Sequence, residues 1–334
     1  MNYLSQEKLA IFGSAGAIGS NMVQAALTLG LTPRIAMYDP FDRGNEGAAE
    51  EIYHCAFPGA RVTFTSDPAE ALEGAAFLIS SGGAPRKDGM TREDLLKGNV
   101  EIAAALGRDI KRHAPSLRLA VIVFNPADIT GLAVLVHSGL APRNVATLAA
   151  LDSTRLQTAL AQHFRVAQDE VEGARTYGGH GEMMAVFAGP AKVAGRPLAK
   201  LIGTPELTHE AWQEIQERVR QGGKRIIQLR GRSSFQSPAH QSVLMVRAML
   251  DGHGYPWPCG VYADAPEHGI EKVVMGMETR IDREGVHGEM PRGSAEEMAA
   301  LRASYEHVAR LRDEVIGMGL LPPLDRFETV NSNL

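Results

Sequence analysis

The sequence has few cysteines, no long apolar run and no excess of basic residues, and each absence excludes a class of protein. Its only two cysteines, Cys55 and Cys259, lie far apart and lack metal-site spacing, so we expect neither a disulfide framework nor a metal centre. No apolar run reaches the roughly 18 residues of a membrane span, and the start MNYLSQEKLAIFG lacks a signal-peptide pattern. The net charge of −5 gives no sign of nucleic-acid binding. These features predict a soluble, cytoplasmic protein that binds neither membrane nor nucleic acid.

The apolar pattern predicts two domains of different architecture, for which 334 residues are enough. In the first part, strand-like runs alternate with helical patterns over short connections, which is typical of a doubly wound parallel sheet of Rossmann type. After about residue 150 the chain changes to helices separated by more polar strands. We therefore expect an α/β protein with a Rossmann-type domain at 1–150 and an α+β substrate domain at 151–334. The predicted strands are 8–12, 34–39, 62–65, 76–81 and 119–125, and the predicted helices are 20–30, 47–57, 93–114, 152–164, 211–229 and 294–319.

The first strand–helix junction reads GSAGAIGS and places Gly13, Gly16 and Gly19 at a G-x-x-G-x-x-G spacing. Glycines there permit a tight turn and a close approach of the backbone to a phosphate at a helix N-terminus. The motif alone also fits an ordinary glycine-rich turn. Asp39 favours the cofactor interpretation, because it ends the next strand, 20 residues after Gly19. A carboxylate at that place binds the adenosine ribose hydroxyls and repels a 2′-phosphate, which favours NAD over NADP.

Hydride transfer with a nicotinamide cofactor requires a proton donor and cations that hold the substrate. His180 lies in TYGGHGEMM, where flanking glycines let the backbone bring an imidazole into a cleft, although a lone histidine in such a turn is more often structural. The segment LDSTRL puts Asp152 and Arg155 three residues apart on one helical face. Asp152 can hold His180 while Arg155 binds a substrate carboxylate. The alternative is a capping aspartate with a surface ion pair.

Residues 82–99, GGAPRKDGMTREDLLKGN, carry two arginines on a loop broken by glycine and proline. The planar forks of Arg86 and Arg92 suit a carboxylate or a phosphate, which indicates an anionic ligand. The alternative is two solvated loop arginines. Asn125, in VFNPADIT, can hydrogen-bond a ligand at the carboxyl edge of the sheet or simply form a turn before the following proline.

Six motifs occur in the order found in the lactate/malate dehydrogenase family, which the chain resembles over nearly its whole length. They are GSAGAIG, YDP, SGGAPRKDGMTREDLLKGN, FNPADI, LDSTRL and YGGHGE. Six ordered motifs are far more specific than any one of them. The resemblance implies NAD as the cofactor and a homo-oligomer of two or four subunits. It also implies reversible hydride transfer between a small 2-hydroxy acid and NAD, with malate and oxaloacetate as the expected pair and a place in the tricarboxylic acid cycle.

The resemblance implies a role for each candidate residue. His180 would be the acid–base and Asp152 its orienting partner, with Arg155 on the C1 carboxylate. Arg92 would polarise the carbonyl, and Arg86 would bind the distal carboxylate that separates dicarboxylate from monocarboxylate substrates. Closure of the loop would exclude water. The further implied substrate contacts are Asn125 and Ser234, or Ser233 if the alignment slips by one residue. The implied cofactor contacts are Gly13, Ala15, Gly16, Ala17, Ile18, Gly19, Asp39, Ser81, Gly82, Gly83, Asn99, Phe124 and Asn125.

Parts of the sequence depart from the family pattern. GRSSFQSPA, at 231–239, stands where many relatives have a small apolar stretch, and the segment 289–297 and the tail 319–334 match poorly. One interpretation of the tail is packing against a neighbouring subunit. Two other functions stay open: a dehydrogenase of another 2-hydroxy acid such as lactate, against which Arg86 argues, and a catalytically silent NAD-binding protein. The silent protein would lack one of the catalytic or binding side chains named above, and none is missing.

Overall fold

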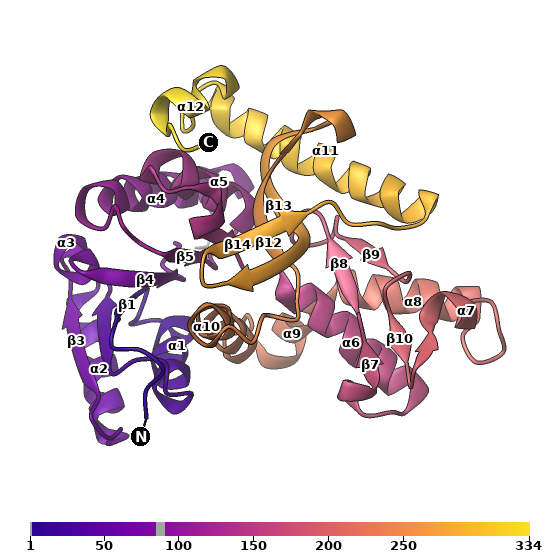
Figure 1. Cartoon of the computed structure of the whole chain (residues 1–334), viewed down its shortest axis with the longest axis horizontal. Coiled ribbons are helices and arrows are strands. Elements are labelled where there is room, and N and C mark those ends of the chain that lie inside the picture. The colour runs from indigo at the N-terminus through magenta and orange to yellow at the C-terminus, as the bar shows by residue number, and fades with distance from the viewer. Residues whose placement is uncertain (1, 85–90) are drawn as a thin grey trace.

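The computed structural model describes residues 2–84 and 91–334, and its central element is a nine-stranded sheet (Figure 1). Its first six strands are β1 Lys8–Phe12, β2 Arg34–Tyr38, β3 Arg61–Thr65, β4 Ala75–Ser80, β5 Leu119–Ile122 and β6 Val145–Thr147. These six are mutually parallel and stand in the order β3-β2-β1-β4-β5-β6. The predicted doubly wound, Rossmann-type sheet is therefore confirmed.

Helices cover both faces of this sheet, which explains why its central strands are almost entirely apolar. The helices α4 (Arg92–His113) and α5 (Ala127–Ser138) pack together on one face, and α1 (Ala17–Thr28) lies beside α10 (Gln236–Asp251) on the other (Figure 1). Every residue of β5 is buried, as expected for a strand covered on both faces. The helices α2 Asp42–His54 and α3 Pro68–Leu72 also belong to this part of the chain. In the part of the chain that the structure describes, no helix combines the length and apolarity that a membrane crossing needs.

The chain after residue 150 completes this core and adds a smaller one. The strands β12 (Cys259–Ala265), β13 (Ile270–Asp282) and β14 (Gly285–Glu289) extend the parallel sheet in antiparallel fashion. The helix α11 (Ala295–Gly317) packs against β13. Because these segments belong to the same sheet as β1 to β6, a domain boundary near residue 150 stays a prediction.

The smaller core lies between two helices and a set of short strands. Its apolar residues come from α6, α8 and the short elements and turns between these two helices. The elements are α6 Ala150–Phe164, β7 Val171–Glu172, β8 Arg175–Tyr177, β9 Ala185–Phe187, β10 Lys192–Val193, β11 Arg196–Pro197, α7 Leu198–Leu201 and α8 His209–Arg220. This region covers only the first part of the α+β substrate domain predicted at 151–334, because the later strands β12 to β14 join the large sheet.

The helix predicted at 211–229 is in fact two helices. α8 ends and α9 (Gly222–Arg230) begins at Gln221, whose φ of −85° and ψ of 5° interrupt the helical turn. Two glycines follow directly, and glycine is a poor helix former because its unfolded backbone is so free. The prediction of one continuous helix is therefore wrong, because two helices meet at Gln221.

The tail at 319–334 packs on its own chain. Phe327 is fully buried, and the Nδ2 of Asn331 donates to the carbonyl oxygens of Leu135 and Leu140 at 2.8 and 2.9 Å. The short helix α12 (Phe327–Val330) thereby lies against α5. Phe327 and Asn331 therefore pack within their own chain, and contact of the rest of the tail with a neighbouring subunit stays a prediction.

A buried asparagine ties the glycine-rich turn to the two strands beside it. Asn45, in α2, has no exposed surface, and its Nδ2 donates to the carbonyl oxygens of Met37 and Thr65, both at 3.1 Å. Its Oδ1 accepts the hydroxyl of Ser14 at 2.6 Å. One side chain therefore holds α2, the ends of β2 and β3 and the turn after β1 together.

Replacing Asn45 with alanine should lower the free energy of unfolding by about 2–3 kcal/mol, because it leaves buried polar groups without partners. Urea unfolding followed by circular dichroism measures the change. The control is Asn21→Ala, which removes one solvent-exposed hydrogen bond to the Ala17 carbonyl and should change stability by less than about 0.5 kcal/mol. Equal effects of the two substitutions would contradict the role assigned to Asn45.

Candidate active site

The junction between β1 and α1 contains backbone contacts that only glycine allows. Gly13 has a φ of +83°, and a Cβ atom there would lie 2.8 Å from the backbone of Gly82, in the turn after β4. A Cβ atom on Gly19 would lie 2.2 Å from the carbonyl oxygen of Gly13, so α1 packs on the turn only without a side chain. Gly16 precedes α1 and offers no side-chain cap. The first N–H groups of α1 are therefore free of a side-chain cap and can donate hydrogen bonds to a phosphate.

A cleft of about 570 Å³ opens beside this turn. Asp39 faces it from the end of β2, and its carboxylate accepts the N–H groups of Ala15 at 3.2 Å and Phe41 at 2.9 Å. These bonds hold the carboxylate of Asp39 where it can accept hydrogen bonds from the hydroxyls of a ribose. The cleft and the glycine-rich turn together therefore fit a dinucleotide. The predicted cofactor residues that line the cleft are Gly13, Gly16, Asp39, Ser81, Gly82 and Gly83. Four further predicted cofactor residues lie in the turn and at the start of α1 but do not line the cleft: Ala15, Ala17, Ile18 and the buried Gly19.

One face of α4 forms another wall of the cleft, and the sequence analysis did not identify it. The residues concerned are Ile102, Ala105, Leu106 and Asp109. Their spacing of three, four and seven residues after the first is that of one helical face. That periodicity was the available signal, but it is equally typical of any helix that packs on a sheet.

Asn99 connects the loop side of the site with the turn after β5. It is buried, its Oδ1 accepts the N–H of Ala84 at 2.7 Å, and its Nδ2 donates to the carbonyl oxygen of Asn125 at 2.7 Å. Phe124 packs closely under Gly83, where an added Cβ atom would lie 2.8 Å from that of Phe124. Both residues thus shape the cleft, and direct contact of Asn99 and Phe124 with a cofactor stays a prediction.

The structure brings Asp152, Arg155 and His180 together around one buried carboxylate. Asp152 is 2% exposed, and its Oδ2 lies 2.8 Å from the Nδ1 of His180. Its Oδ1 accepts the Nη1 of Arg155 at 2.7 Å. The negative charge of Asp152 raises the pKa of the His180 imidazole, and this effect outweighs burial, which acts in the opposite direction. The imidazole is therefore held at Nδ1, and the carboxylate favours its protonated form.

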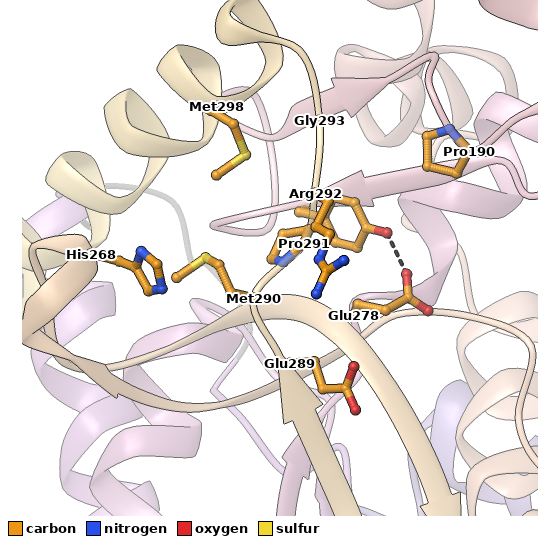
Figure 2. Close-up of a pocket in the computed structure, with 10 residues that line it drawn as sticks. Pro190, His268, Glu278, Glu289, Met290, Pro291, Arg292, Gly293 and Met298 are labelled. Atoms are coloured by element: carbon orange, nitrogen blue, oxygen red, sulfur yellow. Dashed lines mark hydrogen bonds between the residues drawn. The ribbon is translucent and has the colours of Figure 1, made fainter.

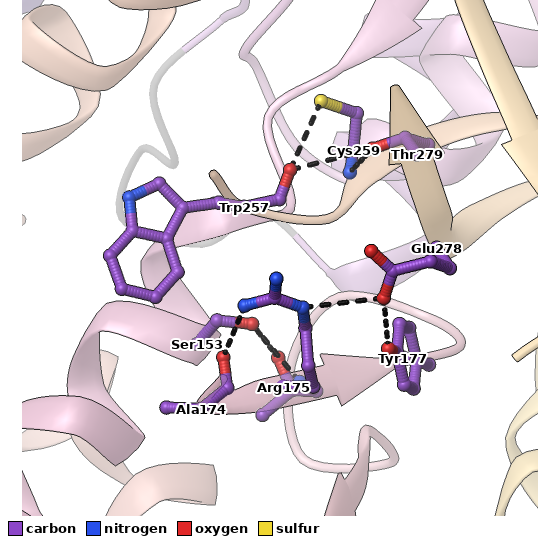
Figure 3. Close-up of polar contacts among 9 residues, drawn as sticks. Ser153, Ala174, Arg175, Tyr177, Trp257, Cys259, Glu278 and Thr279 are labelled. Carbon is purple, nitrogen blue, oxygen red and sulfur yellow. Dashed lines mark hydrogen bonds and ion pairs between the residues drawn. The ribbon is translucent and has the colours of Figure 1, made fainter. Parts of the chain in front are cut away.

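Hydrogen bonds and an ion pair link the segments that carry Asp152 and His180, and Figure 3 shows the contacts of Ser153, Arg175, Tyr177 and Glu278 among them. Ser153, next to Asp152, accepts the N–H of Thr176 at 3.0 Å and shares a hydroxyl hydrogen bond with the same residue at 3.0 Å. On either side of Thr176 in β8, the Nε of Arg175 donates to Glu278 of β13 at 3.2 Å, and the Tyr177 hydroxyl bonds the same carboxylate. The start of α6 and the end of β8, which leads to His180, are thus fixed to β13 and to each other.

A second buried carboxylate, which the sequence analysis did not single out, lies beside His180. The Oδ2 of Asp128, in the first turn of α5, accepts the backbone N–H of His180 at 2.8 Å. Its Oδ1 has no hydrogen-bond partner within the described part of the chain. Burial raises the pKa of Asp128 to about 6, and its charge adds to that of Asp152 in raising the pKa of His180. Asp128 therefore positions the backbone of His180 and influences its protonation.

His180 and Asn125 share a cavity of about 340 Å³ with Asp128 and with apolar residues of α4 and α11. Arg155 contacts the same carboxylate as His180, but it is not among the residues that line this cavity. Ser234 lies half-buried in the turn between α9 and α10 and does not line it either. Arg86 lies outside the described residues. Arg92 is the first residue of α4, and its side chain is likewise outside the described part of the structure.

A larger cleft, of about 760 Å³, contains none of the predicted residues (Figure 2). It lies where the segment after β14 passes the ends of β8 and β13, and its polar lining includes Tyr177, Glu278, Glu289 and Arg292. Tyr177 and Glu278 already bond each other there (Figure 2). Cavity size alone would therefore have pointed away from the cluster around Asp152. Among residues 2–84 and 91–334, no three His, Cys, Asp or Glu side chains are grouped to hold a metal ion.

Both parts of the chain are similar to known protein families. Residues 7–147 match the model of the lactate/malate dehydrogenase NAD binding domain, and residues 149–314 match that of the lactate/malate dehydrogenase alpha/beta C-terminal domain. The chain belongs to the lactate/malate dehydrogenase family. It is an NAD-dependent 2-hydroxy acid dehydrogenase.

Individual relatives carry both names of the family. The chain is 32% identical to the malate dehydrogenase of Picrophilus torridus, covering 85% of this chain and 88% of the relative. It is 31% identical to that of Pelagibacter ubique, covering 84% and 88%. The crystal structure of malate dehydrogenase from Plasmodium falciparum matches with a TM-score of 0.85 and 25% identity, over 93% of this chain and 99% of that one. A lactate dehydrogenase from Cryptosporidium parvum, complexed with lactic acid and nicotinamide adenine dinucleotide, matches with a TM-score of 0.83 and 26% identity, over 93% and 98%.

Asp128→Asn should lower the pKa of His180, because it removes one of the two negative charges beside the imidazole while the amide oxygen can still accept the His180 N–H. The difference should be largest above pH 6, where the native carboxyl carries its charge. An NMR titration of histidine ring signals, assigned with a His180→Asn sample, measures it. The control is Asp325→Asn, an exposed position, which should leave the titration unchanged. A pKa of His180 that is unaltered in Asp128→Asn would show that the charge of Asp128 does not reach the ring.

Proposed function

We propose that this chain is a malate dehydrogenase that interconverts (S)-malate and oxaloacetate with NAD. The observation that carries the proposal is the buried Asp152 carboxylate, which holds the imidazole of His180 with one oxygen and the guanidinium of Arg155 with the other. The names of the relatives, malate dehydrogenase at 31–32% identity, support the choice of substrate. So does Arg86, whose cation would match the second carboxylate of oxaloacetate.

The chain's own groups account for binding and proton transfer. Arg155 would hold the C1 carboxylate, Arg92 would polarise the carbonyl and Arg86 would hold the distal carboxylate. Asn125 and Ser234 would complete the contacts with the substrate. The glycine-rich turn and Asp39 would hold NAD, whose nicotinamide would supply or accept the hydride at C2 of the substrate.

His180 would exchange the proton through Nε2, the ring nitrogen that Asp152 leaves open. In malate oxidation it takes the hydroxyl proton while the hydride leaves C2, and Asp152 stabilises the resulting imidazolium. Reduction of oxaloacetate reverses both transfers and requires His180 to start protonated. Because the pKa of His180 is raised, reduction should weaken as the pH rises through that pKa, and oxidation should strengthen.

A dehydrogenase of another 2-hydroxy acid such as lactate is the second candidate. It is favoured by the similarity to a lactate dehydrogenase, whose TM-score of 0.83 nearly equals that of the malate enzyme. The two candidates use the same proposed residues, except that Arg86 has a distal carboxylate to bind only when the substrate is a dicarboxylate. The preference for oxaloacetate or pyruvate therefore distinguishes them.

We also propose that the protein is cytoplasmic, acts in the tricarboxylic acid cycle and forms a homo-oligomer of two or four subunits. Support for the assembly comes from α9, which has no buried residue and leaves Ile227 and Leu229 exposed by 47% and 68%. Apolar side chains on such a helix are typical of a surface covered by another subunit.

NADH oxidation by the purified protein tests the substrate. With NADH it should turn over oxaloacetate far faster than pyruvate, and NADPH should be a poor substitute because Asp39 repels the 2′-phosphate. Arg86→Gln should lower kcat/KM for oxaloacetate by about 10- to 100-fold, the loss of a charge-assisted hydrogen bond, and should spare pyruvate. Lys87→Gln, which removes a neighbouring charge, is the control. A native preference for pyruvate would replace the malate assignment with the second candidate.

His180→Asn should reduce kcat by about two to four orders of magnitude, because it removes the proton donor without altering the cofactor cleft. Binding of NADH, measured by fluorescence titration, should stay within twofold of the native value. His163→Asn, at an exposed position of α6, should match the native enzyme in both measurements. Native turnover in His180→Asn would remove His180 from the mechanism.

A further inference from the structure

The start of α9 is packed against the shaft of Arg155. If Gly222 carried a Cβ atom, that atom would lie 2.5 Å from the Cδ of Arg155 and 2.9 Å from its Nε. Both distances are too short for real contacts, so the arginine occupies the space that any other residue would need. The next glycine differs: a Cβ atom on Gly223 would lie 3.7 Å from the Nη2 of Arg155, an ordinary contact.

Backbone conformation gives no reason for glycine at either position. Neither Gly222 nor Gly223 has a positive φ, so an L-amino acid can adopt both conformations. Within a helix glycine is less favourable than alanine by about 1 kcal/mol. At Gly222 the reason for the missing side chain is therefore the arginine beside it.

We propose that Gly222 is a positioning residue for Arg155, and that its missing side chain sets where the guanidinium meets the carboxylate of the substrate. The inference rests on the proposed role of Arg155 in substrate binding. Arg155 is fixed on its other side by the 2.7 Å bond from Nη1 to Asp152. It is thus held between one carboxylate and one glycine, and its side chain is 22% exposed.

A side chain at 222 would move Arg155 rather than unfold the protein. The nearest atoms in the way are Cγ, Cδ and Nε of the flexible arginine side chain, and none of the three belongs to a backbone. A shift of about 1 Å in a group that binds substrate bidentately can cost about 100-fold in rate, because the two hydrogen bonds depend on a planar alignment. The effect should appear mainly in KM, since the proton donor His180 keeps its own bond to Asp152.

The experiment compares Gly222→Ala with Gly223→Ala, two identical substitutions in adjacent positions of one helix. Steady-state kinetics with NADH and oxaloacetate, NADH titration by fluorescence, and thermal unfolding are measured for each. Gly222→Ala should lower kcat/KM at least about tenfold, mainly through KM. NADH affinity and stability should be retained. Gly223→Ala should stay within twofold of the native enzyme in every measurement.

Arg155→Ala, alone and combined with Gly222→Ala, completes a double-mutant cycle. If Gly222 acts through Arg155, the second substitution should cause no further loss once the arginine is gone. Should Gly222→Ala fail to fold alone, folding of the double variant would still support the contact, because truncation removes the obstructing atoms. Failure of both to fold would assign Gly222 to the fold itself and overturn the inference.

The remaining outcomes separate the inference from the proposed function. Equal kinetics for Gly222→Ala and Gly223→Ala, whether both native or both impaired, would overturn the role of Gly222. If Arg155→Ala loses oxaloacetate binding while Gly222→Ala does not, only the positioning inference fails. If Arg155→Ala keeps the native KM for oxaloacetate, the proposed role of Arg155 fails, and the inference fails with it.

Discussion

The candidate active site depends on the carboxylate of Asp152. One of its oxygens holds the imidazole of His180, and the other holds the guanidinium of Arg155. A buried charge is costly unless it is paired and hydrogen-bonded, and here both partners are also proposed to act on the substrate. The same bonds that make the burial of Asp152 tolerable therefore orient the proton donor and a binding arginine.

Much of the surrounding structure serves to keep that carboxylate and its partners in place. Ser153 and Thr176 join the start of α6 to β8, and Glu278 joins β8 to β13. Asp128 reaches the backbone of His180 from α5. Elements from both halves of the chain thus support the pair of Asp152 and His180, so the site depends on contacts between residues far apart in the sequence.

The cofactor cleft is built on a different constraint, the close approach of two turns. Gly13 and Gly82 touch through their backbones, so the turns after β1 and β4 meet at the edge of the sheet without side chains between them. This leaves the start of α1 open and brings the carboxylate of Asp39 to the rim of the cleft. Because the requirement is for missing side chains at set positions, it leaves a visible pattern in the sequence.

The sequence by itself determined the features that depend on local periodicity and on residue type at short spacing. Those are the alternation of buried strands and helices, the glycine-rich turn, Asp39 at the end of the next strand, and the pair Asp152 and Arg155 on one turn of α6. Only the tertiary structure decided that β12 to β14 join the first sheet, that Asp128 lies beside His180, that Gly222 lies against Arg155, and that the tail packs on α5. Those features join residues far apart in the chain, and a local pattern is the same whichever distant partner it meets. The break at Gln221 belongs with them, since two glycines weaken a helix but packing decides whether it ends.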